Sequence, residues 1–168
     1  MALRIAVDLI AREGVEAFSL RAVAREAGVS PSALYRHFAD REALLVAVAG
    51  DGFARLAARF QAVDGPGRFE AMGATYVAFA VENPTVFRLM FRQGGTAAGE
   101  SAWGALVGAV AAEGVPASEQ RAAALLAWSA VHGFACLRID GALAADRIDE
   151  GLGDVLRGVS KALAGRTP

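Results

Sequence analysis

The chain has 168 residues and a mass of 17.4 kDa, enough for one or two domains with a hydrophobic core. It is 55% hydrophobic with a mean hydropathy of +0.37, a composition that excludes a disordered protein. The formal net charge of −1 excludes a protein that coats nucleic acid indiscriminately, although a small basic face would be enough to bind DNA.

The composition also indicates the cellular compartment. A single cysteine, Cys136, excludes an internal disulfide framework and a cysteine-based zinc finger, and it suits the reducing cytoplasm. The N-terminal residues carry charges at Arg4, Asp8 and Arg12, so we expect no signal peptide. The most apolar run, residues 122–137, is shorter than the roughly 20 residues that a membrane span needs. We therefore expect a cytoplasmic protein with no membrane partner.

The first three predicted helices form an N-terminal unit. Apolar residues at helical spacing predict a helix over residues 3–13. Ser19 is a favourable N-cap for a second helix, which Gly28 ends, and Ser30 caps a third helix with Pro31 at its first position. Two capped helices joined by a short turn are typical of a helix-turn-helix, whose second helix enters the DNA major groove.

Residues 28–45, which include this second helix, read GVSPSALYRHFADREALL. Nine of them fall on one fixed-spacing pattern: Gly28, Val29, Ser30, Leu34, Tyr35, His37, Phe38, Glu42 and Leu44. This pattern resembles the recognition-helix signature of TetR-family transcriptional repressors. Ala33 stands where threonine is common, Arg41 replaces the usual lysine, and the chain begins without the basic N-terminal arm of many relatives. The resemblance implies a DNA-binding regulator that a small apolar effector releases from its operator.

Several residues of this unit are candidates for DNA contact. We expect Ser32, Ala33 and Arg36 to face the base edges, and only Arg36 can contact guanine bidentately. The resemblance implies phosphate contacts for Tyr35 and His37. The further phosphate candidates are Ser19, Arg21, Arg25, Ser30 and Arg41. The alternative for Arg36 is a solvated side chain or a phosphate contact, and for the others an ordinary surface position.

Helical periodicity continues to the end of the chain. We expect further helices over residues 40–63, 69–82, 84–91, 102–112, 118–139 and 146–163. Asp40, Ser118 and Asp146 are the predicted N-caps of three of them. Residues 93–101 are expected to form a flexible loop. Gly50 and Gly52 should each lower the stability of the first of these helices by about 1 kcal/mol relative to Ala, which predicts a weak point midway.

Since no segment alternates with period two, we expect an all-α fold of about nine helices. Residues 1–47 are predicted to form a helix-turn-helix DNA-binding domain. Residues 48–168 are predicted to form a helical domain for effector binding and dimerisation.

A second group of residues indicates a ligand site in the C-terminal part. Trp128 and His132 lie one helical turn apart in AWSAVHGFACLRIDGAL. This run, together with ENPTVFRLMF at residues 82–91, resembles the tryptophan–histidine–glycine C-terminal domain of one TetR subgroup. The predicted lining of an apolar effector pocket is Tyr76, Phe79, Phe87, Met90, Trp103, Trp128 and His132. The alternative is a core histidine hydrogen-bonded to a backbone carbonyl, with Trp128 packed beside it.

Small and apolar residues on the last two helices favour an isologous four-helix interface between two copies. The resemblance implies the same homodimer, and packing within one chain is the alternative. We expect no enzyme, cofactor or metal site, because the two histidines lie far apart and the chain has no Gly-rich phosphate loop or metal-ligand cluster. A rival hypothesis is a helical ligand-binding or interaction protein that has lost DNA binding.

Overall fold

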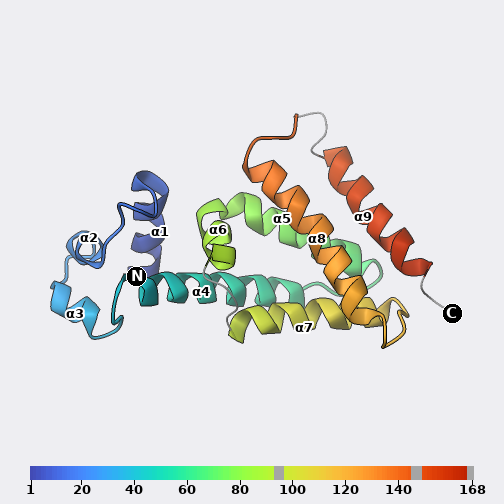
Figure 1. The fold of residues 1–168 in the computed structure, drawn as a ribbon, viewed down its shortest axis with the longest axis horizontal. Helices are drawn as coiled ribbons and strands as arrows, with labels where there is room; N and C mark the ends of the chain where they lie inside the picture. The colour runs from blue at the N-terminus through green and yellow to red at the C-terminus, as the bar shows by residue number, and fades with distance from the viewer. Residues whose placement is uncertain (93–96, 145–148, 166–168) are drawn as a thin grey trace. The chain divides into compact units, whose positions relative to one another are not determined.

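The computed structural model describes residues 1–92, 97–144 and 149–165, and within these ranges it contains nine α-helices and no β-strand (Figure 1). The expected all-α class is confirmed. The chain divides into two compact units: unit 1 comprises Met1–Phe53 and Thr85–Gly99, and unit 2 comprises Ala54–Pro84 and Glu100–Pro168. The domain boundary between residues 47 and 48 stays a prediction, and unit 1 includes a later segment that this boundary leaves out.

Unit 1 begins with three short helices and the first part of a long one. These are α1 (Ala2–Glu13), α2 (Leu20–Glu26), α3 (Pro31–Tyr35) and α4 (Arg41–Gln61). Two predicted caps are confirmed: Ser19 Oγ accepts a hydrogen bond from the Ala22 amide, and Asp40 Oδ1 accepts one from the Ala43 amide. The caps satisfy backbone donors that the first turn of a helix leaves without a partner.

A hydrophobic core holds the helices of unit 1 together. Leu9, Val23 and Leu34, from α1, α2 and α3, are each at most 5% exposed. Phe18 precedes α2 and is 2% exposed in the same cluster. Leu89 of α6 (Pro84–Arg92) joins this core, so α6 packs with the N-terminal helices. Each such buried side chain contributes about 1.5–3 kcal/mol of transfer free energy.

The two glycines within α4 lie in different surroundings. A Cβ on Gly52 would lie 2.6 Å from Val86 Cγ1 and 2.8 Å from Met90 Sδ, both on α6. At Gly50, by contrast, nothing lies within 4 Å of such a Cβ. α4 runs without interruption through both positions. Gly52 therefore marks a close approach of two helices, and the weak point expected midway along α4 stays a prediction.

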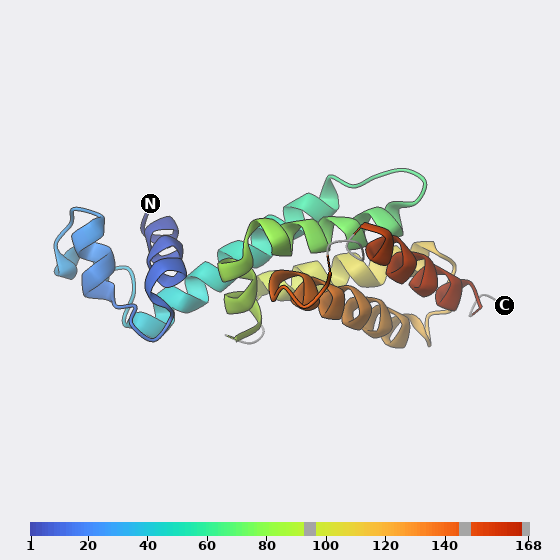
Figure 2. The ribbon, with the colours of Figure 1, turned by 90° about the horizontal axis from the view of Figure 1, so that it is seen from above.

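Unit 2 contains the last part of α4 and four further helices: α5 (Arg68–Glu82), most of α7 (Ala97–Ala112), α8 (Gln120–Ile139) and α9 (Asp149–Ala164). α5, α8 and α9 pack against one another (Figure 2). Ala80 on α5 and Ala123 on α8 are fully buried. Ser160 of α9 also donates a hydrogen bond to the Glu70 carboxylate of α5.

Two predicted helix starts in the second half of the chain were wrong. α7 begins at Ala97, so residues 97–101 are helical rather than part of a loop, because Ala97 and Ala98 favour helix. α8 has Glu119 rather than Ser118 at its N-cap, since residues 116–119 form a turn first. Residues 93–96 of the predicted loop and the predicted cap Asp146 lie outside the described residues.

α8 is long and apolar enough to cross a membrane when judged by length and composition alone. A third of its most apolar window is buried inside the protein. The core helices of many proteins pass the same test, so this helix is weak evidence for a membrane span. α8 packs against α5 and α9, while its residues Leu125, Leu126 and Leu137 are exposed.

Candidate functional site

The helix-turn-helix of unit 1 consists of α2, a turn over residues 27–30, and α3. Gly28 has a φ of 68°, a left-handed conformation that favours glycine and lets the chain reverse after α2. Ser30 Oγ accepts a hydrogen bond of 3.2 Å from the Ala33 amide, with Pro31 at the first position of α3. Leu34 is 5% exposed and anchors α3 to the core. The Ser30 cap and Pro31 therefore set where α3 begins, and the buried Leu34 sets which side of α3 faces the core.

The opposite surface of α3 carries polar side chains. Tyr35 is 47% exposed, and Ser32, Arg36 and His37 are also exposed. Ala33 is partly buried. Ser32 Oγ lies 3.0 Å from Ser30 Oγ, so these two hydroxyls share a hydrogen bond. Ser32 and Tyr35 on α3, and Arg36 and His37 directly after it, are therefore accessible, whereas the predicted base reader Ala33 is less so.

The remaining phosphate candidates differ in their surroundings. Ser19, Arg21 and Arg25 are exposed on or beside α2. Arg41 is partly buried, and its guanidinium donates hydrogen bonds to the Phe18 and Val15 carbonyl oxygens. Arg41 therefore holds the loop between α1 and α2 in place. We expect Arg41 to affect DNA binding indirectly, by stabilising the fold of unit 1.

Unit 2 contains a hydrogen-bonded cluster of three side chains, Tyr76, Trp128 and His132. Trp128 Nε1 donates to the Tyr76 hydroxyl over 3.1 Å, and that hydroxyl lies 2.7 Å from His132 Nδ1. Because an indole can only donate, the Tyr76 oxygen accepts the bond from Trp128. On the other side of the ring, His132 Nε2 lies 3.5 Å from Cys136 Sγ.

Burial keeps this cluster uncharged. Desolvation raises the pKa of Tyr76, which the hydrogen bond from Trp128 only partly offsets. Desolvation also lowers the pKa of His132, which favours the neutral imidazole. The Tyr76 hydroxyl is thus a side-chain partner of His132, which the sequence-based alternative of a backbone carbonyl did not include. The indole of Trp103 lies 6.1 Å from that of Trp128 and extends the aromatic surface.

Comparison with known proteins identifies the family. Residues 2–48 match "Bacterial regulatory proteins, tetR family", and residues 69–158 match "Tetracyclin repressor-like, C-terminal domain". The chain belongs to the TetR family. The likeness to the tryptophan–histidine–glycine subgroup within it stays a prediction.

Solved structures agree with this assignment. A protein of unknown function from Rhodococcus sp. RHA1 is 30% identical, with 99% of this chain and 94% of that chain covered and a TM-score of 0.77. A regulatory protein of the tetR family from Rhodococcus RHA1 is 22% identical, with 99% and 95% covered and a TM-score of 0.67. A TetR variant from Acinetobacter baumannii AYE in complex with minocycline is 18% identical, with 99% and 97% covered and a TM-score of 0.72.

The seven predicted effector-binding residues of this TetR-family chain do not all come together. Tyr76, Trp103, Trp128 and His132 are neighbours in unit 2. Phe79 is also in unit 2 but lies beneath the guanidinium groups of Arg55 and Arg59 of α4, at 5.6 and 5.3 Å from its ring centroid.

The other two predicted lining residues, Phe87 and Met90, belong to unit 1. Both are at most 1% exposed there. Phe87 packs edge-on against Phe91, and Met90 lies against Gly52. Their periodic apolar spacing therefore reflects core packing in this TetR-family chain, which local sequence cannot distinguish from a pocket lining.

The sequence analysis did not single out Arg138, which lines a surface hollow in unit 2. A signal for it exists in the sequence. Arg138 is a charged residue in the last turn of a helix that is otherwise mostly apolar, and it lies one helical turn after Phe134 on the same face.

Proposed function

We propose that this TetR-family protein is a transcriptional repressor whose α3 enters the major groove of an operator. The observation that carries the proposal is the exposed group Tyr35, Arg36 and His37 on a helix held in place by the Ser30 cap and the Leu34 anchor. Arg36 has the donor geometry to contact guanine, whereas Tyr35 and His37 have the reach and polarity for phosphate oxygens.

We further propose that a small apolar effector binds in unit 2 beside Trp103, Trp128 and His132. The aromatic surface there offers apolar contact, and the Tyr76 and His132 groups offer one or two hydrogen bonds. The minocycline complex of a protein with the same fold supports a small-molecule effector. Since Tyr76 and His132 already bond each other, a polar effector group would have to replace that bond.

The proposed homodimer forms through α8 and α9, and it places the two recognition helices about 34–36 Å apart so that they enter successive major grooves. A regulator of this kind works in the cytoplasm and needs no catalytic group. α4 has residues in both units, and it is the element through which effector binding would change the separation of the recognition helices. A coupling of about 1–3 kcal/mol is typical of such regulation.

The DNA-binding part of the proposal is tested with two substitutions on α3. Fluorescence anisotropy measures binding to DNA from upstream of the gene and to a shuffled sequence of equal length. Tyr35→Phe removes only a hydroxyl and should weaken binding to both DNAs equally, because phosphate contacts carry no sequence information. Arg36→Ala should cost about 1–3 kcal/mol on the upstream DNA and little on the shuffled DNA.

Lys161→Ala is the matched control, because it removes one exposed positive charge from α9 of unit 2. It should bind both DNAs as the wild type does. If Arg36→Ala and Lys161→Ala behave alike on the upstream DNA, α3 does not read the operator and the proposal fails.

A further inference from the structure

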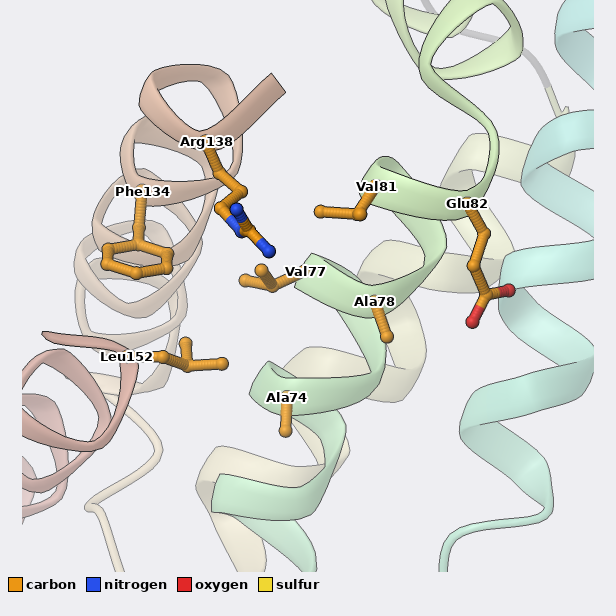
Figure 3. Close-up of a pocket in the computed structure, with 8 residues that line it drawn as sticks. All are labelled: Ala74, Val77, Ala78, Val81, Glu82, Phe134, Arg138 and Leu152. Carbon is orange, nitrogen blue, oxygen red and sulfur yellow. The ribbon is translucent and has the colours of Figure 1, made fainter. Parts of the chain in front are cut away.

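A surface hollow of about 250 Å³ lies between α5, α8 and α9 of unit 2 (Figure 3). Its walls are largely apolar. They consist of Ala74, Val77, Ala78 and Val81 on α5, Phe134 and Arg138 on α8, Leu152 on α9, and the rim residue Glu82. The volume suits a compact small molecule, because drug-sized ligands usually occupy about 300–1,000 Å³.

Arg138 brings a positive charge into this apolar hollow. Its side chain is partly buried and extends from α8 toward Val77 and Val81 of α5 (Figure 3). Within the part of the chain that the structure describes, its guanidinium has no hydrogen-bond or ion-pair partner. Partial removal of a charge from water is unfavourable without a partner, so an anion at this position would be stabilised.

Glu82, the acidic residue at the rim, does not neutralise Arg138. Its carboxylate lies 2.7 Å from the Arg59 guanidinium of α4, with which it forms an ion pair. Figure 3 shows Glu82 on the side of α5 that faces α4, away from Arg138. The hollow therefore combines apolar walls with one positive charge that the described residues leave uncompensated.

We propose that this hollow binds an organic carboxylate with a compact apolar body. The guanidinium fork of Arg138 receives the carboxylate, and Phe134, Leu152 and the valines of α5 cover the hydrocarbon part. The site shares no lining residue with the effector cluster of Tyr76, Trp128 and His132, and the proposal does not depend on DNA binding.

Isothermal titration of the full chain with three probes tests this site, and DNA is absent throughout. Octanoate supplies both the charge and the apolar body, octanol supplies the body alone, and acetate supplies the charge alone. Octanoate should bind about 10-fold or more tightly than either of the others, because a charge-assisted hydrogen bond to arginine accounts for a factor of this size. Equal affinities for octanoate and octanol would overturn the proposal, as would no binding of octanoate.

Two variants locate the binding. Arg138→Gln should weaken octanoate binding about 10-fold or more and leave octanol unchanged, whereas Ala74→Leu should weaken both by filling the hollow. Arg121→Gln, an exposed arginine on the same helix, is the control and should bind octanoate as the wild type does. If Arg138→Gln and Arg121→Gln bind octanoate equally well, Arg138 does not hold the carboxylate and the proposal is wrong. Circular dichroism confirms that each variant is folded.

Discussion

The Tyr76 hydroxyl is the centre of the hydrogen-bonded cluster, because it bonds both Trp128 Nε1 and His132 Nδ1. Tyr76→Phe removes the hydroxyl that accepts from Trp128 Nε1 and that shares a hydrogen bond with His132 Nδ1. We expect it to lower the free energy of unfolding by about 1–3 kcal/mol, measured by urea denaturation. Tyr35→Phe is the control, because Tyr35 is 47% exposed, and its unfolding should match that of the wild type. Equal stabilities of the two variants would contradict the hydrogen-bonded cluster.

The buried imidazole of His132 predicts a dependence of stability on pH. Because burial lowers the pKa of His132 in the folded protein, the unfolded chain binds the proton more readily. The free energy of unfolding should therefore be largest above the unfolded-state pKa of about 6.5 and fall as the pH drops below it. Urea titrations at several pH values should show a weaker dependence in His132→Gln than in His37→Gln. The same dependence in both variants would count against this role of His132.

The two glycines of α4 form a matched pair for a test of packing. Gly50→Ala adds a methyl group to open space within a helix and should stabilise the protein by up to about 1 kcal/mol. Gly52→Ala places the same methyl group against Val86 and Met90 and should destabilise it by about 1–3 kcal/mol. Chemical denaturation measures both. Stabilisation by Gly52→Ala would show that α4 and α6 are not in close contact.

Sequence reasoning was most successful for features that depend on neighbouring residues. The N-caps Ser19 and Ser30 were predicted because a hydroxyl meets an amide three residues later in the same chain. The hydrogen bond between Tyr76 and His132 was not predicted, because it joins side chains 56 positions apart on different helices. Local periodicity also cannot show that Leu89 of α6 packs into the N-terminal core, because that contact depends on the tertiary fold.

At the scale of elements, α8 presents large apolar side chains to solvent. Leu125, Leu126 and Leu137 are 52%, 42% and 47% exposed. Leu126 and Leu137 are eleven residues apart, about three helical turns, and so lie on nearly the same face. Exposed apolar groups aligned in this way favour association, which agrees with the proposed dimer through α8 and α9.

Charged substitutions on this face test the dimer. Leu126→Glu combined with Leu137→Glu should produce a monomer in sedimentation velocity, because two carboxylates per subunit would be buried without partners. Val46→Glu is the control, since Val46 on α4 is 43% exposed and lies outside the proposed interface. A double variant that sediments like the Val46→Glu protein would exclude this face of α8 from the interface.

In the whole molecule, the proposed function joins a unit that binds DNA to a unit that binds a small effector. If an effector lowers the affinity of the protein for its operator, the operator must lower the affinity for the effector by the same factor, because the two affinities are thermodynamically linked. Such regulation needs two conformations of the protein, one that binds DNA and one that does not. An effector with equal affinity for these two conformations would not change DNA binding, however tightly it binds. The proposed repressor therefore requires that the effector favour the conformation that does not bind DNA.

The most direct test of the central claim is the affinity of the wild-type protein for labelled DNA, measured by fluorescence anisotropy at two salt concentrations. The account predicts tighter binding to DNA from upstream of the gene than to a shuffled sequence of equal length. Binding to both should weaken as salt rises, because phosphate contacts release counterions. No binding to either DNA at low salt would contradict the account and favour a ligand-binding or interaction protein that has lost DNA binding.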